Sequence, residues 1–344
     1  MRTHCIAILA LLLLLISGCS EKREARLEAA RKEIHNTAHE MSKEGKYREA
    51  YKYLETGIKE SQRDWVYYFY HGLYLQLENP IYNLQRSTAD YLKAHELNPD
   101  EYRPAVFLGA AYNVTDDYES AILYLEKAVK LFDTSQPEGH PYDSLASAYY
   151  NSGDYYKAFE ANTKAIEFEP DDAWNYLDKG LILSHLEGLE PLIENYQRAV
   201  EMDPDEIEFP KYYGNRLIEM GYDELAVEHF NSFLAEDENA SWCYADLGYI
   251  KMAQGDWERG KELLDKAESI GSNDRITHMY LAFYHYFRGK IGRAYDYYVD
   301  YRLTWEKNTL IHKPKSVKEF EEFFANVRLF QRLQKVNSEQ EAGS

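Results

Sequence analysis

Small residues recur along this chain at a spacing of about 34 residues, and this recurrence constrains the fold more than any other feature. Residues 139–172, GHPYDSLASAYYNSGDYYKAFEANTKAIEFEPDD, contain two helix-length stretches separated by the turn NSGD. Eight units of this kind begin near Arg31, Trp65, Tyr102, Gly139, Ala173, Ile207, Ser241 and Arg275. The eighth residue of each unit is glycine or alanine: Ala38, Gly72, Gly109, Ala146, Gly180, Gly214, Gly248 and Ala282. Small side chains let two helices cross closely, so the pattern predicts a row of stacked helix pairs.

Two further columns of small residues support the same phase. Twelve positions after the first column stand Ala50, Ala121, Ala158, Ala226, Gly260 and Ala294, with Leu192 as a departure. A column in the second helix holds Ala94, Ala128, Ala165, Ala199 and Ala267, with Phe233 and Tyr301 as departures. This pattern resembles the tetratricopeptide repeat (TPR). The resemblance implies an all-α, right-handed superhelical solenoid of about eight helix-turn-helix repeats over residues 31–308, in which neighbouring repeats stabilise one another.

The resemblance also implies a binding surface, because the first helix of each such repeat lines the concave side of the solenoid. The positions that correspond are Phe69, Leu73, Asn113, Tyr150, Asn151, Leu177, Lys211, Asn215, Tyr249, Phe283 and Tyr286. Lys211 and Asn215 match the first two residues of the carboxylate clamp that some TPR domains use. The later clamp positions hold Asp246, Ile276 and Tyr280, which disfavours a clamp here.

The segment from residue 309 to 337 has the features of a helix that covers the last repeat. Ser316 and Glu319 form a capping box after Pro314. An apolar stripe at helical spacing follows, made of Phe320, Phe323, Phe324, Val327 and Phe330. Terminal repeats need such a cover, although a docking helix for a partner would have the same pattern. The polar residues 338–344 are expected to be disordered.

The N-terminus has the features of an export signal. Eleven apolar residues run from Ile6 to Ile16, whereas a membrane span needs about 20. Ile16-Ser17-Gly18-Cys19 resembles the bacterial lipobox. The resemblance implies that residues 1–18 are removed, that Cys19 carries lipid and that residues 19–30 form a tether. With Ser20 after the cysteine, it implies the outer membrane of a bacterial cell envelope, facing the periplasm. The alternative is an ordinary signal peptide with an incidental cysteine.

Charge and cysteine content narrow the function further. The formal net charge of −20 disfavours nucleic acid as a partner. Cys5 lies in the signal and Cys19 in the lipobox, so Cys243 has no cysteine with which to form a disulfide. His35 and His39 lie four residues apart, but no third metal ligand is placed by spacing. We find no phosphate-binding glycine loop, nucleophile elbow or CxxC motif, and we therefore expect neither enzymatic activity nor a cofactor.

These observations predict a membrane-anchored scaffold or adaptor that binds other envelope proteins. The alternatives are a secretin assembly factor similar to type IV pilus pilotins, or a peptide- or glycan-binding envelope receptor. The receptor is suggested by the 32 tyrosines, which can line a groove, although most are expected in helix packing.

Overall fold

The computed structural model describes residues 20–133, 141–271, 275–305, 317–325 and 327–343. Within these ranges the chain forms eighteen α-helices and one short 3-10 helix, with no β-strand. It divides into two compact units, Met1–Leu186 and Glu187–Ser344, called here the N-terminal and C-terminal units.

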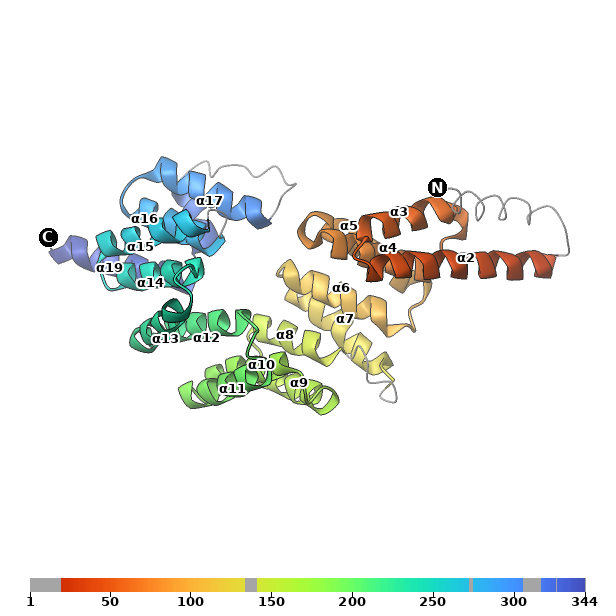
Figure 1. Cartoon of the computed structure of the whole chain (residues 1–344), viewed down its shortest axis with the longest axis horizontal. Coiled ribbons are helices and arrows are strands. Elements are labelled where there is room, and N and C mark those ends of the chain that lie inside the picture. The colour runs from red at the N-terminus through yellow and green to blue at the C-terminus, as the bar shows by residue number, and fades with distance from the viewer. Residues whose placement is uncertain (1–19, 134–140, 272–274, 306–316, 326, 344) are drawn as a thin grey trace. The chain divides into compact units, whose positions relative to one another are not determined.

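The N-terminal unit is a series of helix pairs, and each helix packs on the next one along the chain (Figure 1). The first helices of its repeats are α2 (Ser20–Lys43), α4 (Trp65–Glu78), α6 (Tyr102–Val114), α8 (Tyr142–Ser152) and α10 (Ala173–Leu186). The second helices are α3 (Tyr47–Gly57), α5 (Pro80–Leu97), α7 (Tyr118–Leu131) and α9 (Tyr155–Phe168), and η1 (Glu60–Gln62) precedes α4.

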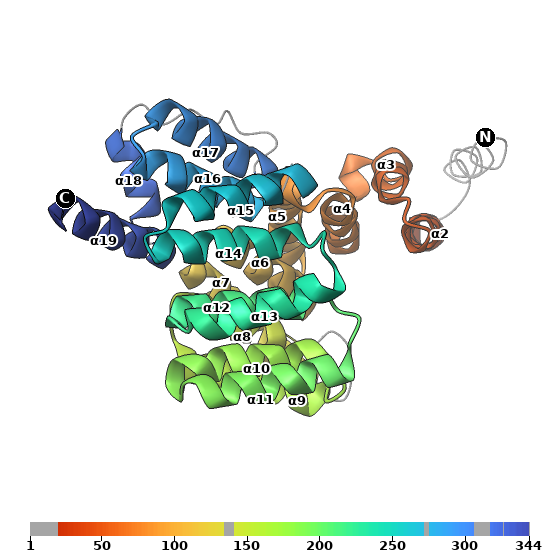
Figure 2. The ribbon, with the colours of Figure 1, turned by 60° about the vertical axis from the view of Figure 1, so that its left-hand side comes forward.

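The C-terminal unit continues the alternation and then adds two helices. It begins with the second helix α11 (Leu189–Met202), followed by the pairs α12 (Glu208–Met220) and α13 (Asp223–Glu236), α14 (Ser241–Ala253) and α15 (Trp257–Ile270), and α16 (Arg275–Phe287) and α17 (Ile291–Trp305). The added helices are α18 (Val317–Phe324) and α19 (Arg328–Gly343). Both lie beside the last repeats (Figure 2).

The predicted phase of the repeats is confirmed. Helices α4, α6, α10, α14 and α16 begin at the predicted residues, and α12 begins one residue after its predicted start. The small residues at the eighth position of every repeat are buried. So are the alanines of the other two columns, together with Gly260, and Leu192 is buried as well. Close helix crossings therefore occur where the sequence placed its smallest residues.

Short polar sequences start many of the second helices. The side chains of Asp117, Asp154 and Asp256 each accept a hydrogen bond from the backbone N–H three residues later. These aspartates satisfy backbone donors that a helix start leaves free. Before Asp154 and Asp256, Gly153 and Gly255 adopt positive φ angles of 85° and 84°, which end the preceding helices.

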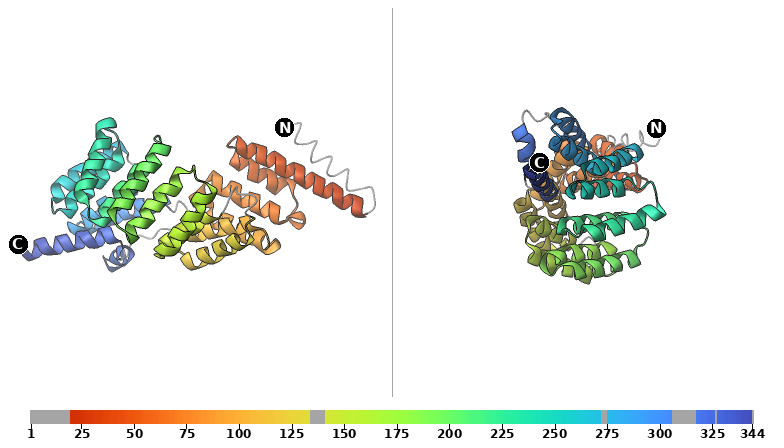
Figure 3. Two further views of the ribbon diagram at one scale, coloured as in Figure 1. Left: turned by 90° about the horizontal axis from the view of Figure 1, so that it is seen from below. Right: turned by 90° about the vertical axis from the view of Figure 1, so that its left-hand side faces the viewer.

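Three predicted boundaries differ from the structure. Helix α2 is continuous from Ser20, so residues 20–30 are helical rather than a separate tether, and α2 extends past α3 (Figure 3). The C-terminal cover is two helices, because the chain leaves the helical path between Phe324 and Arg328. The segment after Asn337, predicted to be disordered, is helical through Gly343 because α19 packs on the repeats. Ser316 of the predicted capping box lies outside the described residues.

Candidate binding surfaces

The first helices of the N-terminal unit present a row of hydrogen-bonded polar side chains. Asn113 Nδ2 of α6 donates to Ser147 Oγ of α8 at 3.1 Å. Asn151 Nδ2, one turn further along α8, donates to Asn113 Oδ1 at 3.0 Å. Asn151 is exposed, while Asn113 and Ser147 are half-buried. We call these three residues the polar row.

Aromatic side chains lie on the same helices as the polar row. Tyr150 Oη of α8 lies 3.2 Å from His185 Nε2 of α10, and the two rings meet edge to face. The ring of Tyr155 stacks on His185 with 3.8 Å between the centroids. Because Tyr150 is half-buried, part of this aromatic group is accessible next to Asn151.

Four of the predicted groove residues are buried, and the prediction that they contact a partner is therefore wrong. Phe69 is 4% exposed, and Leu177, Tyr249 and Phe283 are 0% exposed. Phe69 packs edge to face on Phe107 of the next repeat, with 5.4 Å between the ring centroids. Large apolar side chains on a first helix thus pack against the neighbouring repeat.

Side chains and backbone of the C-terminal helices contact predicted positions in the last two repeats. Tyr249 Oη donates to the backbone oxygen of Leu329 at 3.2 Å. Phe283 meets Phe324 and Phe330 with centroid distances of 4.8 and 5.2 Å. Tyr286 stacks on Phe320 with 4.9 Å between the centroids. The groove residues were predicted from first-helix positions alone, and these positions do not indicate which side chains α18 and α19 cover.

The remaining predicted positions have mixed environments. Lys211 Nζ forms an ion pair with Glu208 Oε1 at 2.5 Å and lies 5.9 Å from the centre of the Trp242 ring. Asp246 is 2% exposed and accepts a hydrogen bond from Tyr280 Oη at 3.0 Å. A buried aspartate in this position does not suit a carboxylate ligand. Leu73 and Asn215 are half-buried. Cys19 lies outside the described residues.

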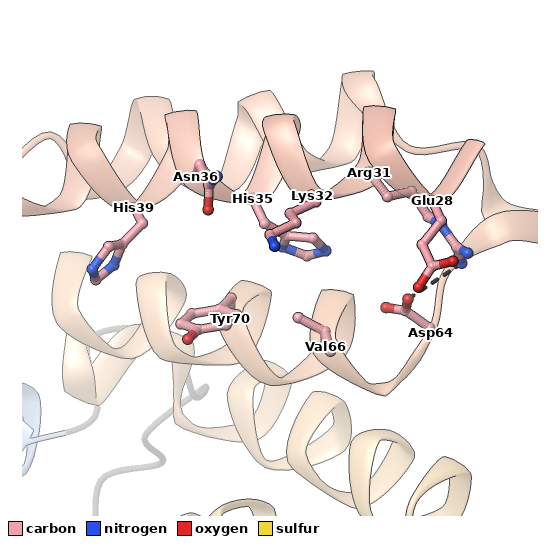
Figure 4. Close-up of a pocket in the computed structure, with 9 residues that line it drawn as sticks. All are labelled: Glu28, Arg31, Lys32, His35, Asn36, His39, Asp64, Val66 and Tyr70. Carbon is pink, nitrogen blue, oxygen red and sulfur yellow. Dashed lines mark hydrogen bonds and ion pairs between the residues drawn. The ribbon is translucent and has the colours of Figure 1, made fainter. Parts of the chain in front are cut away.

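A pocket between α2 and α4, with a volume of about 330 Å³, was not predicted (Figure 4). Helix α2 contributes six side chains from one face, and α4 contributes an apolar and an aromatic side chain. The pocket is lined by Glu28, Arg31, Lys32, His35, Asn36, His39, Asp64, Val66 and Tyr70. The sequence signal was the spacing of the polar residues on α2, which places them on one helix face.

The two ends of this pocket are lined by different side chains. Arg31 Nη1 lies 3.2 Å from Asp64 Oδ2 and also donates to the backbone oxygen of Gln62. Glu28 lies at the same end, whereas His39 lies at the other end over Tyr70 (Figure 4). Burial lowers the pKa of His35, and Asp64 partly opposes the shift. His35 is therefore neutral at pH 7.

Two general properties bear on function. Among the described residues, no group of three or more histidine, cysteine or acidic side chains is arranged to hold a metal ion. None of the helices in the described ranges is long and apolar enough to cross a membrane.

Tyrosines contribute heavily to helix packing. Tyr67, Tyr74, Tyr91, Tyr249 and Tyr280 are among the largest buried side chains. Burial raises the pKa of Tyr67 and of Tyr74 to about 12. Much of the tyrosine excess therefore has a structural explanation.

Comparisons with known proteins agree with the repeat architecture. A family model for the tetratricopeptide repeat matches residues 103–134 and 140–172, which include α6–α7 and α8–α9. None of the curated protein sequences matches this chain.

Several solved structures are similar to the chain. A tetratricopeptide repeat protein from Parabacteroides merdae is 17% identical, with a TM-score of 0.58, over 73% of this chain and 97% of its own. MamA from Desulfovibrio magneticus RS-1 is 20% identical over 52% of this chain and 97% of its own, with a TM-score of 0.44. YrrB, described as a TPR protein with an unusual peptide-binding site, is 22% identical over 54% of this chain and 95% of its own, with a TM-score of 0.35. The chain therefore carries tetratricopeptide repeats, and its fold is that of an all-helical TPR solenoid.

Proposed function

We propose that this protein is a lipid-anchored TPR scaffold of the bacterial cell envelope, and that it binds a protein partner on the first helices of its N-terminal unit. TPR proteins generally mediate protein–protein interaction, which supports a protein partner. The anchor rests on the lipobox-like sequence that ends at Cys19.

The polar row is the observation that supports a binding surface on these first helices. The asparagine amides have both donor and acceptor atoms, which suit the backbone of an extended peptide. Tyr150 adds a ring with a polar tip beside Asn151, and tyrosine often contributes strongly to binding energy. In the C-terminal unit Tyr249 and Phe283 have the repeat position of Ser147 and are buried, so they support no such surface.

Affinity capture from intact envelopes tests this proposal. The double variant Asn113→Ala/Asn151→Ala removes the amides of the polar row, and we expect it to recover much less of the partner than the wild-type chain. The matched control is Gln85→Ala, because Gln85 is an exposed amide on the second helix α5. Circular dichroism checks that both variants fold. Equal recovery by the folded double variant and the control would exclude the polar row as the binding surface.

A further inference from the structure

Buried polar atoms without hydrogen-bond partners gather at the pocket between α2 and α4. In the described residues, Arg31 Nε and both ring nitrogens of His35 lack a hydrogen-bond partner. All three atoms belong to side chains that line this pocket. An unsatisfied buried polar group costs about 1–3 kcal/mol, so a ligand that forms hydrogen bonds with these groups would be favoured.

Other side chains that line the pocket supply further hydrogen-bond donors. Lys32 contributes an ammonium, and Asn36 contributes an amide with two N–H groups. Lys32, Asn36 and His39 are exposed, so an incoming ligand can reach them. The two carboxylates that line the pocket lie toward its Arg31 end (Figure 4). Asp64 accepts from Arg31 and from the backbone N–H of Tyr67, and Glu28 lies at the Arg31 end (Figure 4).

We propose that this pocket binds an oxyanion, a carboxylate or phosphate group, at the end formed by Lys32, His35, Asn36 and His39. Lys32 supplies the charge, and the amide of Asn36 and the two imidazoles supply hydrogen bonds. The ring of Tyr70 forms the opposite wall, with centroid distances of 6.0 Å to His35 and 6.3 Å to His39. A volume of about 330 Å³ suits a small molecule or one terminal group of a peptide.

Anion binding is coupled to protonation of His35. The neutral ring has one donor and one acceptor nitrogen, whereas the protonated ring has two donors. A bound anion favours the charged ring and so raises its pKa. The other titratable groups that line the pocket are Glu28, Arg31, Lys32 and His39 of α2, and Asp64 and Tyr70 of α4. Affinity for the anion therefore increases as pH falls from neutral towards 5.5.

Histidine NMR on the purified full chain tests this proposal with sulfate, phosphate and acetate as probes. Sulfate keeps its charge over this pH range, so its titrations at pH 7.5 and 5.5 isolate the contribution of the protein. We expect saturable shifts of the His35 and His39 ring signals and tighter binding at pH 5.5. Lys32→Gln should weaken binding about tenfold, because it removes a charge-assisted hydrogen bond. Lys43→Gln, an exposed lysine on the same helix outside the pocket, should leave binding unchanged.

A peptide with a free C-terminal carboxylate and the same peptide with an amidated terminus separate the two sources of the oxyanion. If the peptide with the free terminus binds more tightly than acetate, the pocket is assigned to a peptide. If this peptide and acetate bind with equal affinity, the pocket is assigned to a small anion. Absence of ring shifts with all probes would overturn the proposal, and so would binding that is identical in Lys32→Gln and the wild-type chain. This proposal does not depend on the polar row, because Asn113→Ala/Asn151→Ala leaves the pocket intact.

Discussion

At the scale of single residues, a glycine in these helices is required where a side chain of the neighbouring helix packs directly against it. A Cβ atom on Gly214 would overlap the ring of Phe230, which is itself 0% exposed. A Cβ on Gly292, in α17, meets no atom within 4 Å. The same residue type is therefore required at one position and dispensable at the other.

This contrast gives a paired prediction within the C-terminal unit. Gly214→Ala should lower the free energy of unfolding by about 1–3 kcal/mol, because a buried ring has to move. Gly292→Ala should leave stability unchanged or raise it by up to about 1 kcal/mol, because alanine favours the helix. Urea denaturation of the two variants measures both values. Equal effects would contradict the close crossing of α12 and α13 at Gly214.

A second prediction at this scale concerns His285, which is 2% exposed and stacks on Tyr297. Burial, followed by Lys261 and other nearby cations, lowers its pKa to about 4. The unfolded chain binds this proton near pH 6.5, so the fold loses stability as pH falls from 6.5 towards 4. His285→Phe keeps the ring and removes the titration.

Between pH 7 and 4.5 we expect the wild-type chain to lose about 2 kcal/mol more unfolding free energy than His285→Phe. Denaturation curves at several pH values measure this difference. Tyr222→Phe is the control, because Tyr222 is exposed and its replacement keeps the ring. Parallel profiles for the wild-type chain and His285→Phe would show that His285 does not carry this dependence.

At the scale of elements, α19 is held on the repeats by polar contacts as well as apolar ones. Arg332 Nη1 donates to Asp223 Oδ1 at 2.8 Å, and Arg332 Nη2 binds the other oxygen of this carboxylate. Trp257 Nε1 donates to Gln340 Oε1 at 2.9 Å. These contacts join α19 to the start of α13 and to α15, while Phe330 is buried against Phe283 of α16.

We predict that Arg332→Ala loosens α19 and lowers the free energy of unfolding by about 1–2 kcal/mol. The reason is that Asp223 would lose a two-point, charge-assisted partner in a half-buried position. Hydrogen exchange should show reduced protection in α19 and α14. Lys335→Ala is the control, since Lys335 is largely exposed and its pair with Glu339 is 4.0 Å long. Unchanged protection in Arg332→Ala would mean that the apolar contacts alone hold α19.

At the scale of the whole molecule, the two units use their first helices differently. The N-terminal unit presents the polar row and the pocket on α2 and α4, whereas first-helix residues of the last repeats lie beneath α18 and α19. Because α2 starts at Ser20, the helix that lines the pocket begins next to the predicted lipid attachment site. The proposed binding surfaces therefore belong to the unit that follows the anchor.

The anchor itself gives the prediction at this scale. Cys19→Ala should prevent lipid attachment, so that the protein is no longer recovered with the membrane fraction as the processed lipoprotein. Mass spectrometry of the mature N-terminus and membrane fractionation measure this. Ser20→Ala is the control, because it leaves the cysteine in place. An unmodified mature N-terminus at a residue other than Cys19 in the wild-type chain would refute the proposed anchor.

The sequence by itself determined the repeat architecture. Small residues at the crossing positions and the turn NSGD between two helix-length stretches are local signals, and each acts within one or two helices. Gly72, Gly109 and Gly248 could be placed at helix crossings without knowledge of any distant contact. The phase of the repeats, and with it Asn113, Tyr150 and Asn151 on first helices, followed from those signals alone.

Only the tertiary structure decided which first-helix residues remain accessible. Tyr249 and Phe283 have the same repeat positions as candidate binding residues, but they are covered by a segment more than 40 residues away in sequence. The pocket also required the structure, because its walls come from α2 and α4 and its depth depends on how closely the two helices pack. Burial of a side chain depends on every segment that packs over it, and a repeat pattern records only the neighbours within the array.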